Sequence, residues 1–262
     1  MRPVVSMVPS WTETLIAARL NVVGRTRFCI HPKDAIQKIP SLGGTKTLAV
    51  DARETMARVC AASKLKPIVV LDREENPKEY MTFFNQFDCE IVTTHVSDFA
   101  SLSSDLATLA QAFLTGSRDD VEGADALCRL AQRAALVADP RASHAVVPPA
   151  DETAAETYYF IWKNPWMVVS DDTWIGAVLR TVFSGVRLPK SLGSKYPTID
   201  IDEIPKGSNL LFSSEPYPFE REWASLQEMP FVKSAKSASL VDGELFSWFG
   251  IRAIRFLEER NS

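Results

Sequence analysis

The chain has 262 residues, of which 46% are hydrophobic, and a formal net charge of -4. This length and apolar content suffice for one large core or two smaller ones, which excludes an intrinsically disordered protein. The charges are mixed and no run of Lys and Arg occurs, so nucleic acids and anionic membrane surfaces are excluded as partners. No stretch of about 18 apolar residues is present, and we expect no membrane insertion.

The first ten residues contain an apolar stretch that is short and broken by proline. They lack the small-residue cleavage site of a secretion signal, and residues 4–8 are typical of a β-strand instead. We therefore expect a cytoplasmic protein, or a periplasmic one if the sequence is that of a trimmed chain.

The four cysteines, Cys29, Cys60, Cys89 and Cys128, show no CxxC spacing. Their scatter predicts reduced thiols, and three of them lie in apolar contexts where they would pack as small hydrophobic side chains. Cys29 is the exception, because His31 follows two residues later.

The first half alternates short apolar strands with amphipathic helices, the pattern of a parallel sheet with crossover helices. Strands are expected at residues 4–8, 21–23, 67–71 and 90–93, and helices at 10–20, 51–63 and 78–87. Ser10 and Glu13 have the spacing of a capping box at a helix start, and Asp51 and Glu54 repeat it.

From residue 101 to 138 the apolar spacing predicts two successive helices with no strand between them. The second, at 119–138, would be about 30 Å long at 1.5 Å per residue, long enough to link two lobes. A new series follows, with strands at 156–162, 167–169, 209–212 and 238–241 and helices at 172–183, 220–226 and 250–259. The sequence thus predicts an α/β protein with two separate sheets: an N-terminal lobe over 1–118, a linking helix over 119–140 and a C-terminal lobe over 141–262.

In an open α/β sheet, ligands bind beyond the carboxyl ends of the strands. Five tryptophans lie in or beside the loops expected there, Trp11, Trp162, Trp166, Trp174 and Trp248. Because loops normally disfavour such large apolar side chains, a flat or bulky apolar ligand is indicated. We expect Trp11, Trp166 and Trp248 to be partly exposed; the alternative is that each tryptophan closes the end of its own core.

Cys29 and His31 leave three interpretations open. They can supply two soft ligands to a metal, although two ligands do not define a site. They can form a nucleophilic pair with Arg25 or Arg27 nearby, or they can simply pack.

Carboxylates also occupy the expected loops, at Glu74, Glu75, Glu215 and Glu244. They can receive a cation, an amine or a basic patch of a partner, or they can be solvated charges. Gly43-Gly44-Thr45-Lys46 lacks the spacing of a phosphate-binding loop, which argues against nucleotide hydrolysis.

The order of several motifs resembles the class III substrate-binding proteins of ABC transporters, which include the vitamin B12 and ferric-siderophore receptors. Residues 6–15 (SMVPSWTETL) are similar to the opening "SLxPSxTExL" of that family, and residues 23–26 to its "VVGRT". The motifs FCIHP at 28–32, IP at 39–40, GGTK at 43–46, YPF at 217–219 and DGE at 242–244 resemble a helical-backbone metal-receptor subgroup that includes cobalamin-binding proteins.

The resemblance implies two Rossmann-like lobes joined by a single long backbone helix, a ligand in the inter-lobe cleft and an ABC transporter permease as partner. The ligand is not identified, but a corrinoid or a siderophore-like metal chelate suits aromatic walls with few polar contacts. The candidate ligand-binding residues are Trp11, Arg25, Cys29, His31, Lys46, Glu75, Trp162, Trp166, Glu215, Tyr217, Glu244 and Trp248. Cys29 and His31 are also the candidate metal ligands.

Two other functions compete with a binding protein. An enzyme would use Cys29 and His31 in the same cleft, with Glu74 or Glu244 as acid or base. An interaction protein would have a vestigial cleft, with its aromatic side chains packed against one another so that no ligand could enter.

Overall fold

The computed structural model describes residues 1–137, 155–183, 185–191 and 193–261. The chain folds into two compact units. Unit 1 comprises Met1–Leu136 and Trp248–Glu258, and unit 2 comprises Val137–Ser247 and Glu259–Ser262.

Unit 1 contains a parallel sheet in the order β2-β1-β3-β4. Its strands are β1 (Pro3–Ser6), β2 (Asn21–Gly24), β3 (Ile68–Asp72) and β4 (Glu90–Thr94), and its helices are α1 (Pro9–Ala17), α2 (Lys33–Ile36), α3 (Ala52–Ala61), α4 (Glu79–Phe84), α5 (Phe99–Gln111), α6 (Arg118–Val137) and most of α11 (Ile251–Asn261). The strands are short apolar runs and β3 is buried along its whole length, as expected for a sheet covered on both faces.

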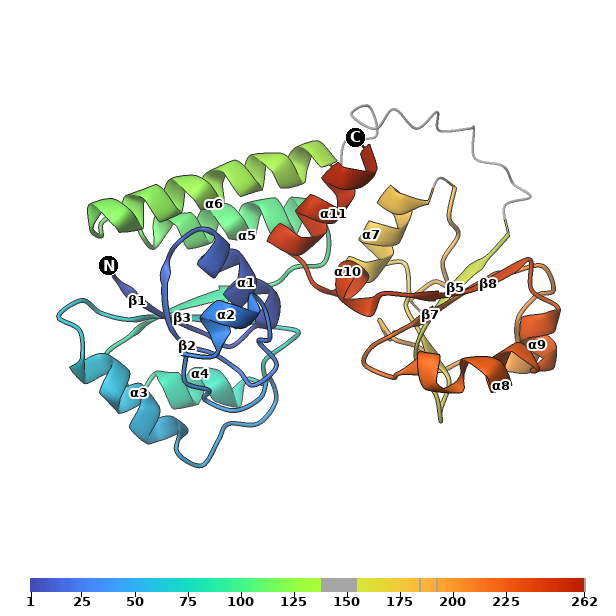
Figure 1. Cartoon of the computed structure of the whole chain (residues 1–262), viewed down its shortest axis with the longest axis horizontal. Coiled ribbons are helices and arrows are strands. Elements are labelled where there is room, and N and C mark those ends of the chain that lie inside the picture. The colour runs from blue at the N-terminus through green and yellow to red at the C-terminus, as the bar shows by residue number, and fades with distance from the viewer. Residues whose placement is uncertain (138–154, 184, 192, 262) are drawn as a thin grey trace. The chain divides into compact units, whose positions relative to one another are not determined.

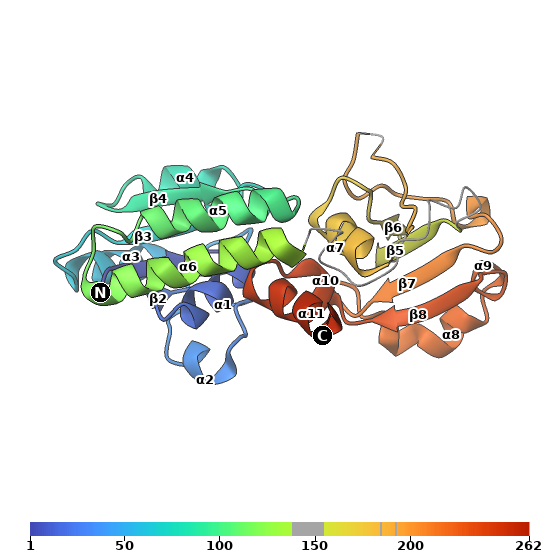
Figure 2. The same ribbon diagram turned by 90° about the horizontal axis from the view of Figure 1, so that it is seen from above.

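Helices α3 and α4 cover one face of this sheet. Val5, Val69 and Leu71 from the strands pack there against Met56 of α3 and Phe84 of α4. Helices α5 and α6 lie side by side above the opposite face (Figures 1 and 2), where Ser103 donates a hydrogen bond to the carbonyl of Ala131 at 3.0 Å.

Unit 2 contains a second sheet in the order β6-β5-β7-β8, in which only β6 is antiparallel. Its elements are β5 (Thr157–Trp162), β6 (Met167–Val168), α7 (Trp174–Val182), η1 (Ile201–Glu203), β7 (Asn209–Ser213), η2 (Phe219–Glu222), α8 (Trp223–Gln227), α9 (Pro230–Lys233), β8 (Ser237–Val241) and α10 (Gly243–Ser247). Phe160 and Phe212 stack face to face at 4.7 Å in its core, and η2, α8 and α9 cover that face of the sheet. The prediction of two separate α/β sheets is confirmed.

The expected capping box at Ser10 is wrong. Helix α1 begins at Pro9, so Ser10 lies inside its first turn and the cap residue Val8 offers no side-chain bond. A proline fits the first helical position because its fixed φ is already helical and it has no N–H to leave unpaired. At α3, Asp51 is the cap residue but makes no side-chain cap bond, and Glu54 pairs with Arg58 instead.

A complete capping box stands at α5, where none was expected. The Asp98 carboxylate accepts from the backbone of Ser101 at 2.7 Å, and the Ser101 hydroxyl accepts from the backbone of Asp98 at 2.9 Å. The helix therefore begins two residues earlier than expected.

The expected linking helix is present as α6, and its last expected residues, 138–140, lie outside the described residues. Nearly all of α6 groups with unit 1. The chain also returns to unit 1 at Trp248, which was expected in the C-terminal lobe. The lobe boundaries at 118 and 140 stay a prediction.

Candidate functional site

The loop after β3 in unit 1 is held by the buried carboxylate of Asp72. Its Oδ1 accepts from the backbone nitrogens of Glu74 and Glu75 at 2.9 and 3.3 Å, and its Oδ2 accepts from the hydroxyl of Thr94 at 2.8 Å. Asp72 and Thr94 end neighbouring strands, so this network joins two carboxyl ends and fixes the backbone that carries Glu74 and Glu75.

A second buried side chain, Asn76, extends this network to β1 and to the loop at residues 43–46. Its amide nitrogen donates to the carbonyls of Met7 and Thr45 at 3.0 and 3.1 Å. The Lys46 ammonium donates to the carbonyl of Glu74 at 2.6 Å. Lys46, expected to bind ligand, thus braces one loop against another.

Trp11 is fully buried in unit 1, and the expectation that it is partly exposed is wrong. Its indole N–H donates to the Thr94 hydroxyl at 2.8 Å, and its ring meets Phe249 edge-on at 5.0 Å. The side chain lies on the core side of α1, where it closes the end of the core and supports the polar network at Asp72.

Cys29 is also fully buried, which contradicts its expected contact with a ligand. Its sulfur shares hydrogen bonds with the hydroxyls of Thr12 and Thr26, both at 3.1 Å. Burial raises the pKa of the thiol, and these hydrogen bonds only partly oppose the rise. A protonated, enclosed thiol is a poor nucleophile and a poor metal ligand. Within the described residues, no three His, Cys, Asp or Glu side chains gather where they could hold a metal ion.

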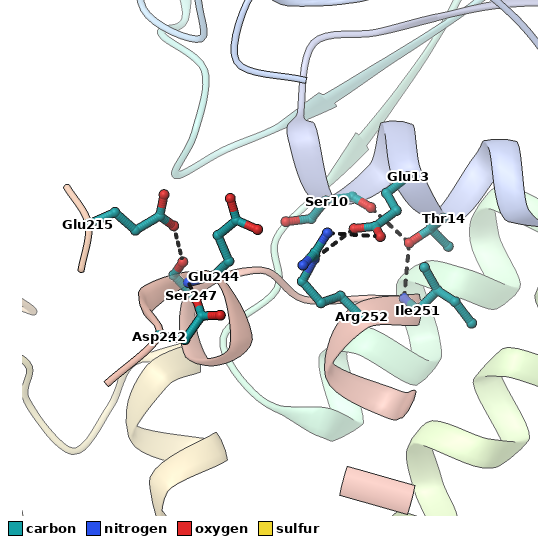
Figure 3. A network of polar contacts seen from close by, with 9 residues as sticks. All are labelled: Ser10, Glu13, Thr14, Glu215, Asp242, Glu244, Ser247, Ile251 and Arg252. Carbon is teal, nitrogen blue, oxygen red and sulfur yellow. Dashed lines mark hydrogen bonds and ion pairs between the residues drawn. The ribbon is translucent and has the colours of Figure 1, made fainter. Parts of the chain in front are cut away.

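His31 is half-buried, and its ring meets that of Trp248 edge-on at 5.5 Å. Trp248 itself is buried, so its expected partial exposure is wrong. The Arg252 guanidinium covers the indole of Trp248 at 5.0 Å and forms two bonds to the Glu13 carboxylate, at 2.9 and 3.1 Å (Figure 3). His31 and Trp248 therefore join the loop after β2 to the segment that begins α11.

The exposed apolar side chains of the loop after β2 are Phe28 and Ile30, each 47% exposed, and neither was among the expected ligand-binding residues. They alternate with the inward-facing Cys29, and the Arg27 guanidinium lies 4.9 Å from the Phe28 ring centre. The alternation in Phe28-Cys29-Ile30-His31 was the signal that could have found them. Arg25, expected to bind ligand, donates to backbone carbonyls of its own loop, including those of Thr26 and Ile39.

In unit 2, an aromatic side chain is exposed where β5 ends. Trp162 is the last residue of that strand and is 40% exposed, and its ring meets Tyr217 edge-on at 5.6 Å. We call Trp162, Lys163, Trp166, Tyr217 and Glu222 the aromatic ledge.

Glu222 is the polar centre of the aromatic ledge. Its carboxylate accepts from the Lys163 ammonium and from the Tyr217 hydroxyl. The bond from Lys163, followed by that from Tyr217, lowers the pKa of Glu222, and the same carboxylate raises the pKa of Tyr217. The ledge thus presents a neutral phenol and a charge-balanced pair beside two indoles.

The two other tryptophans of the unit 2 loops differ in burial. Trp166 is half-buried, as expected, with the Lys163 ammonium 5.6 Å from its ring centre and the Phe219 ring stacked on it at 6.2 Å. Trp174 is buried at the start of α7 and closes the core. Trp166 therefore belongs partly to the core and partly to the ledge.

Glu215 lies in the loop after β7 and is oriented by side chains of unit 2. The Ser247 hydroxyl donates to its carboxylate at 2.8 Å (Figure 3). A Cβ atom at Gly243 would lie only 2.6 Å from Cγ of Glu215, so glycine is required where these loops meet. Glu244 follows, half-buried, with its backbone nitrogen bonded to the Asp242 carboxylate at 3.0 Å.

Comparison with solved structures identifies the fold. The periplasmic vitamin B12-binding protein BtuF of Vibrio cholerae is 14% identical, with a TM-score of 0.71 over 98% of this chain and 94% of that one. The periplasmic haem-binding protein HutB of Vibrio cholerae is 13% identical, with a TM-score of 0.73 over 99% and 97% of the two chains. IsdE of S. aureus, complexed with haem, is 13% identical, with a TM-score of 0.69 over 99% and 97%. No family model and no curated protein sequence matches the chain.

The chain has the two-lobed α/β fold of these binding proteins, and the resemblance to the class III substrate-binding proteins is confirmed at the level of the fold. The comparisons give no support to a cytoplasmic location, because BtuF and HutB are periplasmic. Among the described residues, no helix is long and apolar enough to cross a membrane.

Proposed function

We propose that this protein is the substrate-binding component of an ABC importer and that its ligand is a corrinoid or another metal chelate with a flat or bulky apolar surface. The observation that carries the proposal is the exposure of large apolar side chains at the carboxyl ends of strands in both units. Phe28 and Ile30 provide such a surface in unit 1, and Trp162 provides one in unit 2.

The polar groups beside these surfaces favour a bulky, weakly charged ligand. Lys163 is paired with Glu222, so the unit 2 surface is charge-balanced, and the exposed Arg27 adds a single cation beside Phe28 in unit 1. Aromatic side chains bind flat or apolar molecules at low entropic cost because few rotatable bonds are fixed. The location of the ligand in a cleft between the lobes stays a prediction.

A permease is the partner that follows from this proposal, and the periplasm is the location. Each unit has a half-buried carboxylate in a loop that the network around it holds in place, Glu75 in unit 1 and Glu215 in unit 2. The network holds the backbone of Glu75 and the carboxylate of Glu215, and carboxylates on loops that are fixed in this way suit basic side chains of a partner protein.

Calorimetric titration with cobalamin, haemin and a ferric siderophore tests the proposal. We expect one of these three to bind, and Trp162→Ala to weaken that binding by about 2 kcal/mol, the scale of an interface hot spot. Tryptophan fluorescence, corrected for absorbance by the ligand, should change on binding.

The matched control is Phe183→Ala, which removes another exposed aromatic ring of unit 2, next to the end of α7 and away from the loops after the parallel strands. It should leave the affinity unchanged. Equal losses in both variants, or no binding of any of the three probes, would contradict the proposed ligand class.

A further inference from the structure

Two of the four cysteines, Cys60 and Cys89, lie at the amino-terminal edge of the unit 1 sheet, opposite the loops of the candidate site. Cys60 is in the last turn of α3, and Cys89 immediately precedes β4. Both are half-buried, and both side chains pack against the same apolar cluster of strands β1 and β3 and helices α3 and α4.

The face of α3 that bears Cys60 is turned toward the segment that leads to Cys89. Arg53 precedes Cys60 by seven residues, two turns of helix, so the two side chains share a face. The Arg53 guanidinium lies 5.8 Å from the ring centres of both Phe83 and Phe87 and donates to the side chain of Gln86. The same face therefore meets the chain two residues before Cys89.

A second set of contacts holds residues 66–67, which lead from α3 into β3, against residues 88–90. The Lys66 ammonium pairs with the Asp88 carboxylate at 2.9 Å, and the Glu90 nitrogen donates to the Pro67 carbonyl at 2.8 Å. The segment of Cys89 is thus in contact both with the face of α3 that bears Cys60 and with the residues that follow α3.

The ionisation of the two thiols is coupled. Burial raises the pKa of Cys89 to about 11, with a further contribution from a negative charge on Cys60. The pKa of Cys60 is raised by burial and then by the Asp88 carboxylate. The Cys89 thiol also donates a hydrogen bond to the carbonyl of Phe84 at 3.3 Å, which holds its proton in place, so Cys60 is assigned as the attacking thiol.

We propose that Cys60 and Cys89 form a reversible intramolecular disulfide when unit 1 meets a disulfide oxidant. In the first step, the Cys60 thiolate attacks a small-molecule disulfide, forms a mixed disulfide and releases one thiolate. In the second step, the Cys89 thiolate attacks the Cys60 sulfur and releases the second thiolate. Overall, two protein thiols are oxidised by two electrons, and one disulfide is reduced to two thiols.

The bond would tie the end of α3 to the start of β4 and close a chain loop of roughly 30 residues. Cross-linking a loop of this size restricts the unfolded chain and raises the melting temperature, unless strain in the folded state offsets the gain.

The remaining two cysteines supply internal controls. Cys29 is buried and bonded to two threonines, so it should stay a thiol in the folded protein. Cys128 is exposed on α6 and should form only a mixed disulfide. Cys128→Ser is therefore the background for the test, because it removes this adduct and intermolecular dimers.

Folded Cys128→Ser protein is incubated with glutathione disulfide at mildly alkaline pH, trapped with acid and analysed by intact mass and peptide mapping. We expect a loss of two hydrogen atoms, a cross-linked pair of peptides containing Cys60 and Cys89, and a melting temperature several degrees higher that a reductant reverses. Adding Cys89→Ser should replace the cross-link by a glutathione adduct on Cys60.

Two results would overturn the proposal. One is glutathione addition to both Cys60 and Cys89 with no loss of hydrogen, which would show that the thiols react but do not meet. The other is complete alkylation of both residues by iodoacetamide after the oxidation step. Neither result bears on ligand binding, which is measured separately on the reduced protein.

Discussion

The carboxyl edges of the two sheets differ in how their polar and aromatic groups are used. In unit 1, Asp72 and Trp11 are buried and bonded to the same threonine, Thr94. In unit 2, Trp162 is exposed, and its neighbours Lys163 and Glu222 pair at the surface. Unit 1 thus closes its edge with a buried network, whereas unit 2 leaves an aromatic surface open.

This difference shows that a tryptophan near a strand end has no fixed role. The role follows from whether its N–H meets a buried acceptor, as for Trp11, or whether its ring is left against a partly exposed neighbour, as for Trp162. Substitution of these two tryptophans should therefore affect the free energy of unfolding to different extents.

The largest expected effect on stability is the difference between Trp11→Ala and Trp162→Ala. Trp11→Ala empties a large buried volume and removes a donor to Thr94, so the free energy of unfolding should fall by about 3–5 kcal/mol. Trp162→Ala should lower it by no more than about 1 kcal/mol, because the side chain is partly exposed. Urea unfolding followed by circular dichroism measures both.

Trp11→Phe separates packing from hydrogen bonding, because it keeps an aromatic ring near Phe249 and loses the bond to Thr94. Its cost should be smaller, about 1–3 kcal/mol. If Trp11→Ala and Trp162→Ala destabilise the protein equally, the distinction between a closed and an open edge is wrong.

Much of the fold could be predicted because strand and helix periodicity is local. The alternation of apolar strands with amphipathic helices indicated both sheets, and the apolar spacing at 119–138 indicated α6. Helix starts were less certain, since Ser10 matches a capping box but Pro9, one residue earlier, fits the first helical position better.

The candidate site could be predicted only in part, because burial is decided by contacts between distant segments. Cys29 faces inward toward Thr12, which lies 17 residues earlier on α1, and no local pattern indicates that contact. Trp162 and Tyr217 were expected from their places after strands, and the structure brings them together through Glu222 and the pairing of β5 with β7. Phe28 and Ile30 were not among the predicted ligand-binding residues, because the prediction placed the thiol of Cys29 on the exposed side of this alternating segment, whereas Cys29 faces the core.

A second effect concerns the attachment of α11 in unit 1. The Glu13 and Arg252 side chains are 16% and 17% exposed and form two hydrogen bonds, a geometry more favourable than that of a surface pair. Arg252→Ala should cost about 1–3 kcal/mol of unfolding free energy, and part of this loss is the charge of Glu13 left without its partner.

A double-mutant cycle with Glu13→Ala measures the coupling between these two residues in unit 1. The same cycle on Lys163 and Glu222 should give a smaller coupling, because that pair in unit 2 is more exposed. A coupling near zero for Glu13 and Arg252 would show that this ion pair does not hold α11, which is then attached by apolar packing and by its other polar contacts, such as that of the Ile251 nitrogen with the Thr14 hydroxyl.

A smaller, pH-dependent effect is expected at Asp120 on α6. Burial alone would raise the pKa of this carboxyl, but bonds from the Ser117 side chain and from the backbones of Ser117 and Arg2 together lower it below the ordinary value of 3.8. A lowered folded-state pKa gives stability that is present above the unfolded pKa and lost as the pH falls through the folded one.

Asp120→Asn tests this dependence. It should cost about 1–2 kcal/mol at pH 7, where the carboxylate accepts these bonds. The difference from the unsubstituted protein should stay constant down to about pH 5 and narrow below about pH 4. Urea midpoints of both proteins, measured across this pH range, test the expectation. If the stability difference between them grows as the pH falls, the pKa of Asp120 is raised and not lowered in the folded protein.

The smallest effect on stability, and the most informative one for the ligand, is expected from Glu222→Gln in the aromatic ledge. The Glu222 carboxylate pairs with Lys163 and raises the pKa of Tyr217. Because the substitution removes its negative charge, the Tyr217 pKa should fall toward its ordinary value of 10.0. Ultraviolet difference absorbance follows that titration, and the urea midpoint should fall only slightly because these groups are partly exposed. Lys163 would then be a cation without its carboxylate partner beside Trp166.

Haemin carries carboxylates, whereas cobalamin carries mainly amides, so the substitution should strengthen haemin binding several-fold at low salt and leave cobalamin binding as it was. The gain should disappear as salt is added. A gain for both ligands would mean that the negative charge of Glu222 disfavours any ligand at the ledge, and no change for either would place the ligand away from the ledge.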